Sequence, residues 1–276
     1  MKNPWLFRLA ILVAVCALLL IADGAMVGPG TQPTPRAMSA HRIAATAVSL
    51  LTLGLVLWLR FTDPRPRARR LGWLTLLIAV LQDSVGHAAV FVLVPRTAGI
   101  AHALMAPLFF AAVLAIAVVT SPGWCRGPEY VRDYGWPSMR SLAILTPILV
   151  VLQILLGAAF RQQVLTLLPH VLGAMFVALV ILLESIFVLQ QFPTHRALAP
   201  AAKTLLGVAF AQVFLGITAL IMKSMASDTD LAVIVTVASH VTGGAITLAT
   251  TVVLSILIRR NVQPKLEEDA EEPAST

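Results

Sequence analysis

The sequence predicts an all-α integral membrane protein with eight transmembrane helices, arranged as two pseudo-symmetric four-helix bundles. Three observations predict this fold. The 276 residues are 58% hydrophobic and only 12% charged, whereas a soluble domain is about one quarter charged. Eight apolar runs approach the roughly 20 residues that a helix needs to cross a bilayer. A pattern of histidine and small residues also recurs in successive pairs of runs, which indicates an internal repeat.

The apolar runs are separated by short polar turns, and one longer polar stretch divides them into two sets of four. They cover about residues 5–22, 38–59, 72–95, 98–120, 141–160, 164–190, 201–223 and 231–258. The sequence therefore predicts an N-terminal bundle at 1–125, a cytoplasmic linker at 126–140, a C-terminal bundle at 141–260 and a disordered acidic tail at 261–276. The first 25 residues also resemble a signal peptide. An uncleaved first helix is favoured because Gly24 belongs to the repeat.

The net charge of +7 follows membrane topology rather than nucleic-acid binding. Most of the 20 Lys and Arg residues fall on one side of the predicted spans. The other side holds Arg36, Arg42, Arg96, Arg161 and Lys223. This positive-inside asymmetry places both termini in the cytoplasm and predicts a multi-pass protein of the bacterial inner membrane. Cys16 and Cys125 fall at different depths, so no disulfide between them is expected.

Each pair of successive runs repeats one arrangement of polar and small residues. The odd-numbered runs carry Gln82/Gly86, Gln153/Gly157 and Gln212/Gly216 at a spacing of four, and the first run keeps only Gly24. The even-numbered runs carry His41, His102, His170 and His240, each followed one turn later by small residues. Small residues there would leave room for a flat, bulky group beside the helix, or would let helices pack closely.

The four histidines are expected at one depth, in the outer half of the membrane, because the even-numbered helices all run in the same direction. Imidazole is a good iron ligand, and helical bundles hold cofactors between facing helices. Two histidines on two helices of one bundle are what bis-histidine haem ligation needs. Zinc is less expected, because structural zinc sites use four ligands at short spacing. The alternative for each histidine is an ordinary hydrogen-bonded contact between helices.

Three charged residues near these histidines are further candidates. Arg161 lies between Gly157 and His170, and it is the best candidate to hold a haem propionate. Asp83 and His87 are one turn apart in the predicted span 72–95, so they are expected to bond each other or to relay a proton. Glu184 is expected to be paired or to face water.

The motifs PHVLGA at 169–174, LQILLGAAFR at 152–161 and HR at 41–42 resemble the heme A synthase family of cytochrome oxidase assembly. The resemblance is strongest in 152–182. It implies that His170 and His240 ligate a haem b cofactor, and that His41 and His102 face a substrate haem in the other bundle. The implied reaction oxidises a methyl group of haem O to the formyl group of haem A by successive hydroxylation, with electrons entering through the cofactor. Heme O synthase and a membrane electron donor are implied partners, and an oligomer is left open.

The sequence departs from this family at two points, both in the half expected to carry catalysis. Met38 stands where the family has a glutamate three residues before the first histidine, and the outer cysteine pair after the first helix is absent. One alternative is a divergent synthase in which Asp83 or Asp23 supplies the carboxylate. A second is a haem b cytochrome or haem-handling protein without synthase activity. A transporter is the third, although the sequence lacks the broken helices expected at a midplane substrate site.

Overall fold

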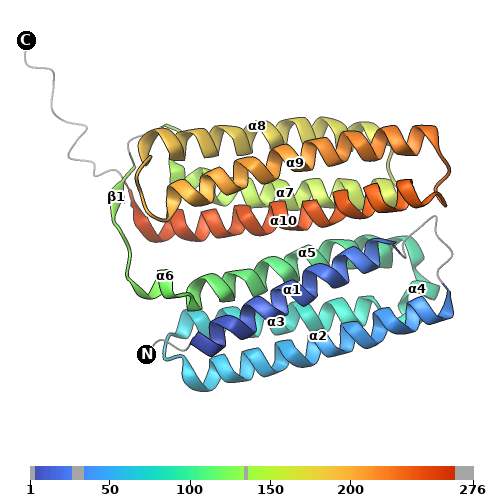
Figure 1. The fold of residues 1–276 in the computed structure, drawn as a ribbon, viewed down its shortest axis with the longest axis horizontal. Helices are drawn as coiled ribbons and strands as arrows, with labels where there is room; N and C mark the ends of the chain where they lie inside the picture. The colour runs from blue at the N-terminus through green and yellow to red at the C-terminus, as the bar shows by residue number, and fades with distance from the viewer. Residues whose placement is uncertain (1–3, 27–33, 134–135, 265–276) are drawn as a thin grey trace, which may run out of the picture.

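The long helices lie side by side in two groups (Figure 1). The computed structural model describes residues 4–26, 34–133 and 136–264. One group contains α1 (Pro4–Met26), α2 (Pro35–Thr62), α3 (Pro66–Val85) and α5 (Pro95–Thr120). The other contains α7 (Met139–Arg161), α8 (Leu167–Gln191), α9 (Leu198–Met225) and α10 (Leu231–Asn261). The short helices α4 (Ala88–Leu93) and α6 (Pro122–Cys125) lie in the connections after α3 and α5. The predicted all-α fold is confirmed for the described residues, apart from two strands of two residues each.

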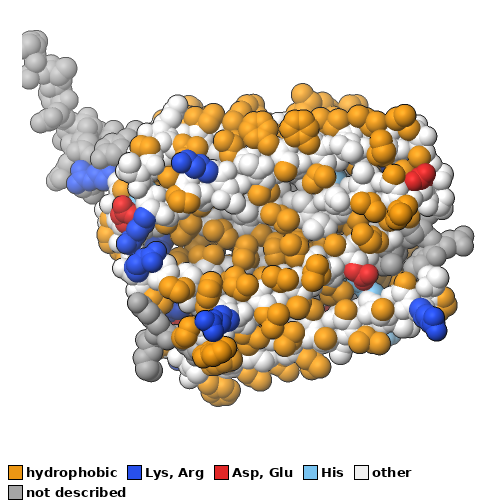
Figure 2. All heavy atoms as spheres, viewed as in Figure 1, with side chains coloured by type: hydrophobic (Ala, Val, Ile, Leu, Met, Phe, Trp, Pro, Cys, Tyr) orange, Lys and Arg blue, Asp and Glu red, His pale blue; other side chains and the backbone are white. Residues whose placement is uncertain are grey.

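Seven of the described helices are long and apolar enough to cross a membrane, namely α1, α2, α5, α7, α8, α9 and α10. Apolar side chains cover most of the face shown in Figure 2, as a surface in contact with lipid requires. Helix α3 is not among the seven, since it begins with Arg67, Arg69 and Arg70 and carries Asp83 near its end. The predicted third span therefore remains a prediction, as does the orientation of the chain in the membrane.

The prediction of one continuous helix over 72–95 is wrong. Helix α3 ends at Val85, and the backbone N–H of Gly86 bonds back to the Gln82 carbonyl oxygen as the helix terminates. Glycine has low helix propensity, which favours a stop at this point. A second break falls at Val94, because the residue before a proline is disfavoured in the helical conformation and Pro95 follows. The short helix α4 fills the space between the two breaks.

Local signals set where the other helices begin. Pro35, Pro66 and Pro95 occupy first-turn positions of α2, α3 and α5, where the missing N–H of proline costs nothing. The hydroxyl of Thr34 accepts a hydrogen bond from the Ala37 N–H at 3.2 Å. The carboxylate of Asp230 likewise accepts from the Ala232 N–H at 2.9 Å at the start of α10.

Helices α5 and α10 join the two groups. They pack against each other, and α10 also packs on α1 while α5 packs on α7. The side chains of Ile116, Leu248 and Leu254 in this region are almost completely buried. Lipid is as apolar as these side chains, so close packing rather than water exclusion holds such helices together.

The predicted linker is fixed to the end of α10 rather than free. Strand β1 (Val131–Arg132) pairs in parallel with β2 (Val262–Gln263). The N–H of Glu129 donates to Asn261 Oδ1 at 2.8 Å, and Arg140 Nη1 donates to the Val262 carbonyl oxygen at 2.7 Å.

The predicted disordered tail is therefore wrong at its start, where residues 261–263 belong to α10 and β2. Residues 265–276 of that prediction lie outside the described residues. Cys16 and Cys125 are both free, as predicted.

The turn between α2 and α3 gives a prediction of pH dependence. Arg65 donates to both carboxylate oxygens of Asp63, from Nε to Oδ1 at 2.9 Å and from Nη2 to Oδ2 at 2.5 Å, and this pairing lowers the pKa of Asp63. A lowered pKa gives stability that is complete above the unfolded pKa of about 3.9 and is lost as pH falls through the folded value. Asp63→Asn should therefore melt at a lower temperature than wild type at pH 7, by an amount equivalent to about 1 kcal/mol, and the difference should shrink as the pH falls below the unfolded pKa and through the lower folded pKa of Asp63. Thermal melts of the detergent-purified protein between pH 7 and pH 3 would measure both, and a constant difference would contradict the prediction.

Candidate functional site

Each of the four predicted histidines lies against a glycine of the preceding long helix. A Cβ atom added to the glycine would lie only 2.7–3.0 Å from Cε1 of the histidine, in the pairs Gly24–His41, Gly86–His102, Gly157–His170 and Gly216–His240. Side-chain Cβ atoms essentially never approach another atom this closely. Only glycine lets an imidazole reach the neighbouring helix in this way. The repeat of glycine and histidine in the sequence thus corresponds to the same glycine–histidine contact at four places in the structure.

His170 of α8 and His240 of α10 lie together in the second group of helices. Their ring centroids are 6.1 Å apart and their planes make an angle of 88°. An imidazole nitrogen bonds a metal at about 2 Å and lies on the order of 1 Å from its ring centroid, so two imidazoles on one ion have centroids about 6 Å apart. Two such ligands can adopt any relative rotation about the nitrogen–metal axis. The separation of this pair therefore fits one iron held between the two rings.

Two glutamines of the repeat hold these two histidines by hydrogen bonds. Gln153 Nε2 lies 2.9 Å from His170 Nδ1 and donates to the backbone carbonyl oxygen of His170 at 2.8 Å. Gln212 repeats both contacts with His240, at 3.2 Å and 3.1 Å. The signal that could have identified them was already visible in the sequence. Each glutamine lies one helical turn before the glycine that contacts the same histidine.

The glutamine contacts determine which imidazole nitrogen is available. With Nδ1 of His170 and His240 occupied by an amide, Nε2 is the nitrogen left to bind a metal. A metal on Nε2 requires a proton on Nδ1, which then needs a hydrogen-bond acceptor. The buried Oε1 atoms of Gln153 and Gln212 have no hydrogen-bond partner. Rotation of either amide would turn its oxygen toward that proton.

The glycines that follow the two histidines do not leave an open space. A Cβ at Gly173 or Gly243 would collide with Oε1 of Gln153 or Gln212, respectively. The space is thus already filled by the glutamine side chains. Of the two sequence interpretations, close helix packing is correct at these two positions, and room for a flat group is not supported there.

In the first group, His41 is paired with a carboxylate. His41 Nδ1 lies 2.7 Å from Asp23 Oδ2, which joins the end of α1 to the start of α2. The Asp23 side chain is half exposed, whereas the His41 side chain is 16% exposed. A carboxylate on Nδ1 orients the ring and makes Nε2 more basic. Asp23 had been only one of two carboxylates considered from the sequence.

His102 has a different environment from the other three histidines. Gln82 Nε2 lies 3.3 Å from its Nε2, while its Nδ1 is buried without a hydrogen-bond partner. Phe91 of α4 stands edge-on to the imidazole, with the centroids 6.0 Å apart and the planes at 77°. The helix break that creates α4 thus places an aromatic ring beside this histidine.

The prediction that Asp83 and His87 lie on one turn of a continuous helix is wrong, because α3 ends at Val85 and His87 lies beyond it. Asp83 Oδ2 accepts a hydrogen bond from Ser49 Oγ of α2 at 2.6 Å. Glu184 of α8 is 1% exposed and lies beside Thr146, so it does not face water.

Arg161, the predicted propionate ligand, lies at the histidine end of the molecule and connects the two groups of helices. Its Nη2 donates to the carbonyl oxygen of Ala25, in the last turn of α1, at 2.6 Å. The neighbouring Gln162 packs against Gly99 of α5. The polar turn after α7 therefore fixes the position of the first group as well as the second.

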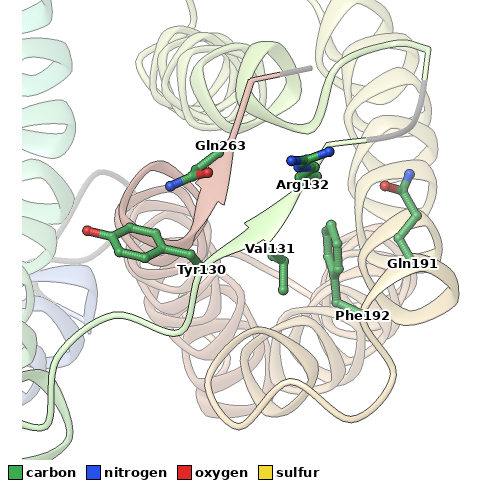
Figure 3. A pocket seen from close by; sticks show the side chains of 6 residues that line it. All are labelled: Tyr130, Val131, Arg132, Gln191, Phe192 and Gln263. Carbon is green, nitrogen blue, oxygen red and sulfur yellow. The ribbon is translucent and has the colours of Figure 1, made fainter. Parts of the chain in front are cut away.

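One cavity lies away from the histidines. It has a volume of about 440 Å³ and lies beside β1 and the end of α8, lined by Tyr130, Val131, Arg132, Gln191, Phe192 and Gln263 (Figure 3). Among the described residues, no group of three or more His, Cys, Asp and Glu side chains is arranged to hold a metal ion. Two imidazoles such as those of His170 and His240 suit a metal that brings its own remaining ligands, as haem iron does.

Together these features define a helical membrane protein with two histidine pairs, one of which is spaced for a bis-imidazole metal site. The cytochrome oxidase assembly protein family (COX15-CtaA) matches the chain over residues 26–114, from the end of α1 into α5. The predicted resemblance to the heme A synthase family is thereby confirmed over this segment. The matched segment contains His41 and His102, whereas the motifs at 152–182 lie outside it. No curated protein matches the chain.

Proposed function

We propose that the chain is a heme A synthase-like membrane oxidase, which converts the methyl group of haem O to the formyl group of haem A with a bound haem b. The observation that carries this proposal is the His170–His240 pair, with its 6.1 Å centroid separation and a glutamine on each Nδ1. The family match over the other histidine pair supports the same function.

In this proposal the second group of helices binds haem b. His170 and His240 ligate the iron through Nε2, and Gln153 and Gln212 orient the two rings. Haem iron, when bound, supplies one-electron and oxygen chemistry. Arg161 has N–H donors beyond the one used on Ala25, and these can hold a propionate at the same end of the bundle.

The first group of helices receives the substrate haem. His41 and His102 face it, and Asp23 holds the Nδ1 proton of His41 so that Nε2 keeps its lone pair. Asp23 thus takes over the role of the carboxylate that Met38 cannot supply. Asp83 is a weaker candidate for that role, because it accepts a hydrogen bond from Ser49, whereas Asp23 lies 2.7 Å from His41 Nδ1. The positive-inside distribution puts this end of the protein outside the cytoplasm, with heme O synthase and the electron donor as membrane partners.

The test is the haem content of the purified protein, measured by extraction, chromatography with mass detection and the reduced-minus-oxidised spectrum. Wild type co-expressed with heme O synthase should contain haem b together with haem O or A derivatives. His170→Ala should lose most of the haem b, because one axial ligand is removed. His41→Ala should retain haem b and lose the derivatives.

His195→Ala is the matched control, since His195 is a buried histidine at the opposite end of the molecule. Its haem content should equal that of wild type. If no haem is found in any sample, the four histidines are ordinary helix contacts and the proposal fails.

The second candidate function is a haem b cytochrome that makes no haem A, and Met38 favours it. Haem b alone, with no derivative even in the presence of heme O synthase, would support this function over the synthase. A redox titration would then show a single reversible haem.

A further inference from the structure

A second cavity, at the end of the molecule opposite the histidines, is lined by three arginines. It has a volume of about 260 Å³ and lies among α5, α6, α10 and the turn before α9. Arg126, Arg196 and Arg260 contribute the cations of its lining. Figure 2 shows Lys and Arg side chains gathered at the end where Figure 1 places α6 and β1. The cavity therefore opens where the helices leave the apolar part of the bundle.

Two of these arginines are held in place by neutral groups. Arg260 Nη2 donates to the carbonyl oxygen of Trp124 at 2.7 Å, and its guanidinium carbon lies 3.7 Å from the centroid of the Trp124 ring. Arg196 Nη2 donates to the carbonyl oxygen of Gly127 at 2.8 Å. Carbonyl and ring contacts fix the position of a guanidinium but leave its charge in place. Arg260 is thus positioned in advance for an anion, whereas Arg196 is positioned in the same way but also forms an ion pair with Glu129.

The positive charge around the cavity exceeds the negative charge. Glu129 lies 3.4 Å from Arg196 Nε and compensates that residue. No acidic side chain is among the residues that line the cavity. The charges of Arg65 and Arg196 also act on Arg260 through space, and Arg65 is itself paired with Asp63. Like charges held together in this way gain stability when an anion enters between them.

The remaining wall of the cavity is apolar. Val118 of α5 and Val253 and Leu257 of α10 are half-buried, and they continue the cavity toward the membrane-spanning part of the two central helices. A free anion would gain nothing from this wall, whereas a lipid would place its acyl chains along it. Basic pockets between transmembrane helices are typical binding sites for anionic lipid headgroups.

From this combination we infer that the cavity binds the phosphate of an anionic phospholipid, with its glycerol and acyl chains along α5 and α10. The headgroup phosphate lies among Arg126, Arg196 and Arg260. The site joins α5, α10 and the turn before α9, so an occupied site links the two groups of helices at the end opposite Arg161. This inference is independent of the haem chemistry proposed above.

Native mass spectrometry of the full-length protein in detergent tests the inference, with phosphatidylglycerol and phosphatidylcholine as probes. Wild type should retain one phosphatidylglycerol with clear preference over phosphatidylcholine. The double variant Arg126→Gln/Arg260→Gln should bind phosphatidylglycerol about tenfold or more weakly. The matched control, Arg36→Gln/Arg96→Gln, removes the same charge from the opposite end and should bind as wild type does.

Three results would overturn the inference. They are equal binding of phosphatidylglycerol by wild type and the double variant, equal binding of the two lipids by wild type, and saturation by inorganic phosphate with no preference for lipid. The last of these would identify a site for free phosphate. Where Arg260→Gln impairs folding because the Trp124 contact is lost, Arg126→Gln alone is the variant to compare, since Arg126 is exposed and should still give a measurable loss of affinity.

Discussion

Gly157→Ala should remove most of the haem b from the protein while leaving the helices folded. The new methyl group would lie 2.8 Å from Cε1 and 3.2 Å from Nδ1 of His170. The ring must therefore move by several tenths of an ångström, yet its Nδ1 is held by Gln153. Metal–ligand distances tolerate changes of only about 0.2 Å. An ordinary packed side chain would tolerate this displacement. At His170 the same displacement is enough to break the bond to the metal.

Gly207→Ala provides the matched control for this prediction. Gly207 lies within α9, and a Cβ added there has no atom within 4 Å. This variant should retain full haem b and gain up to about 1 kcal/mol of helix stability. Haem b per protein, from the absorbance spectrum and extraction, is compared between the two variants at equal helical content by circular dichroism. If Gly157→Ala keeps wild-type haem content, the close contact is not what positions His170.

Composition and hairpin order were sufficient to predict the helical class and to place His170 and His240 in the same group of helices. Apolar runs report membrane spans directly, and two helices joined by a short turn must lie side by side. The break at Gly86 was missed because the apolar pattern continues through 88–94 and hides two local stop signals. The β1–β2 ladder was missed because strands of two residues have no periodicity.

The roles of Gln153 and Asp23 could not be predicted for another reason. Both residues act across the interface between two helices, and the rotation of each helix about its own axis decides whether they meet a histidine. The spacing of Gln153 and Gly157 was visible in the sequence, but the sequence did not show that both residues contact His170. The same uncertainty applies to Asp83, whose hydrogen bond with Ser49 of α2 the sequence did not indicate.

His41 differs from His170 and His240 in the group that holds its Nδ1 atom. His170 and His240 each meet a neutral amide, whereas His41 meets the Asp23 carboxylate at 2.7 Å. A carboxylate partner makes the opposite nitrogen more basic than an amide partner does. A histidine whose Nδ1 is held by an amide suits a permanently bound haem. A histidine whose Nδ1 is held by a carboxylate suits accepting or positioning a proton beside a substrate. This difference assigns catalysis to the first group of helices under the proposed function.

Asp23→Asn should therefore lower conversion of haem O by about 10- to 100-fold, the range found when a partner behind a histidine is removed, while haem b content stays at the wild-type level. Asparagine keeps the size of the side chain but cannot accept the His41 proton as a carboxylate does. Asp23→Glu should recover part of the activity, because it keeps a carboxylate that can accept the His41 proton. Asp83→Asn, measured in parallel by product analysis in reconstituted membranes, tests the other candidate carboxylate. Loss of conversion in Asp83→Asn but not in Asp23→Asn would transfer the role to Asp83 and separate catalysis from the His41 contact.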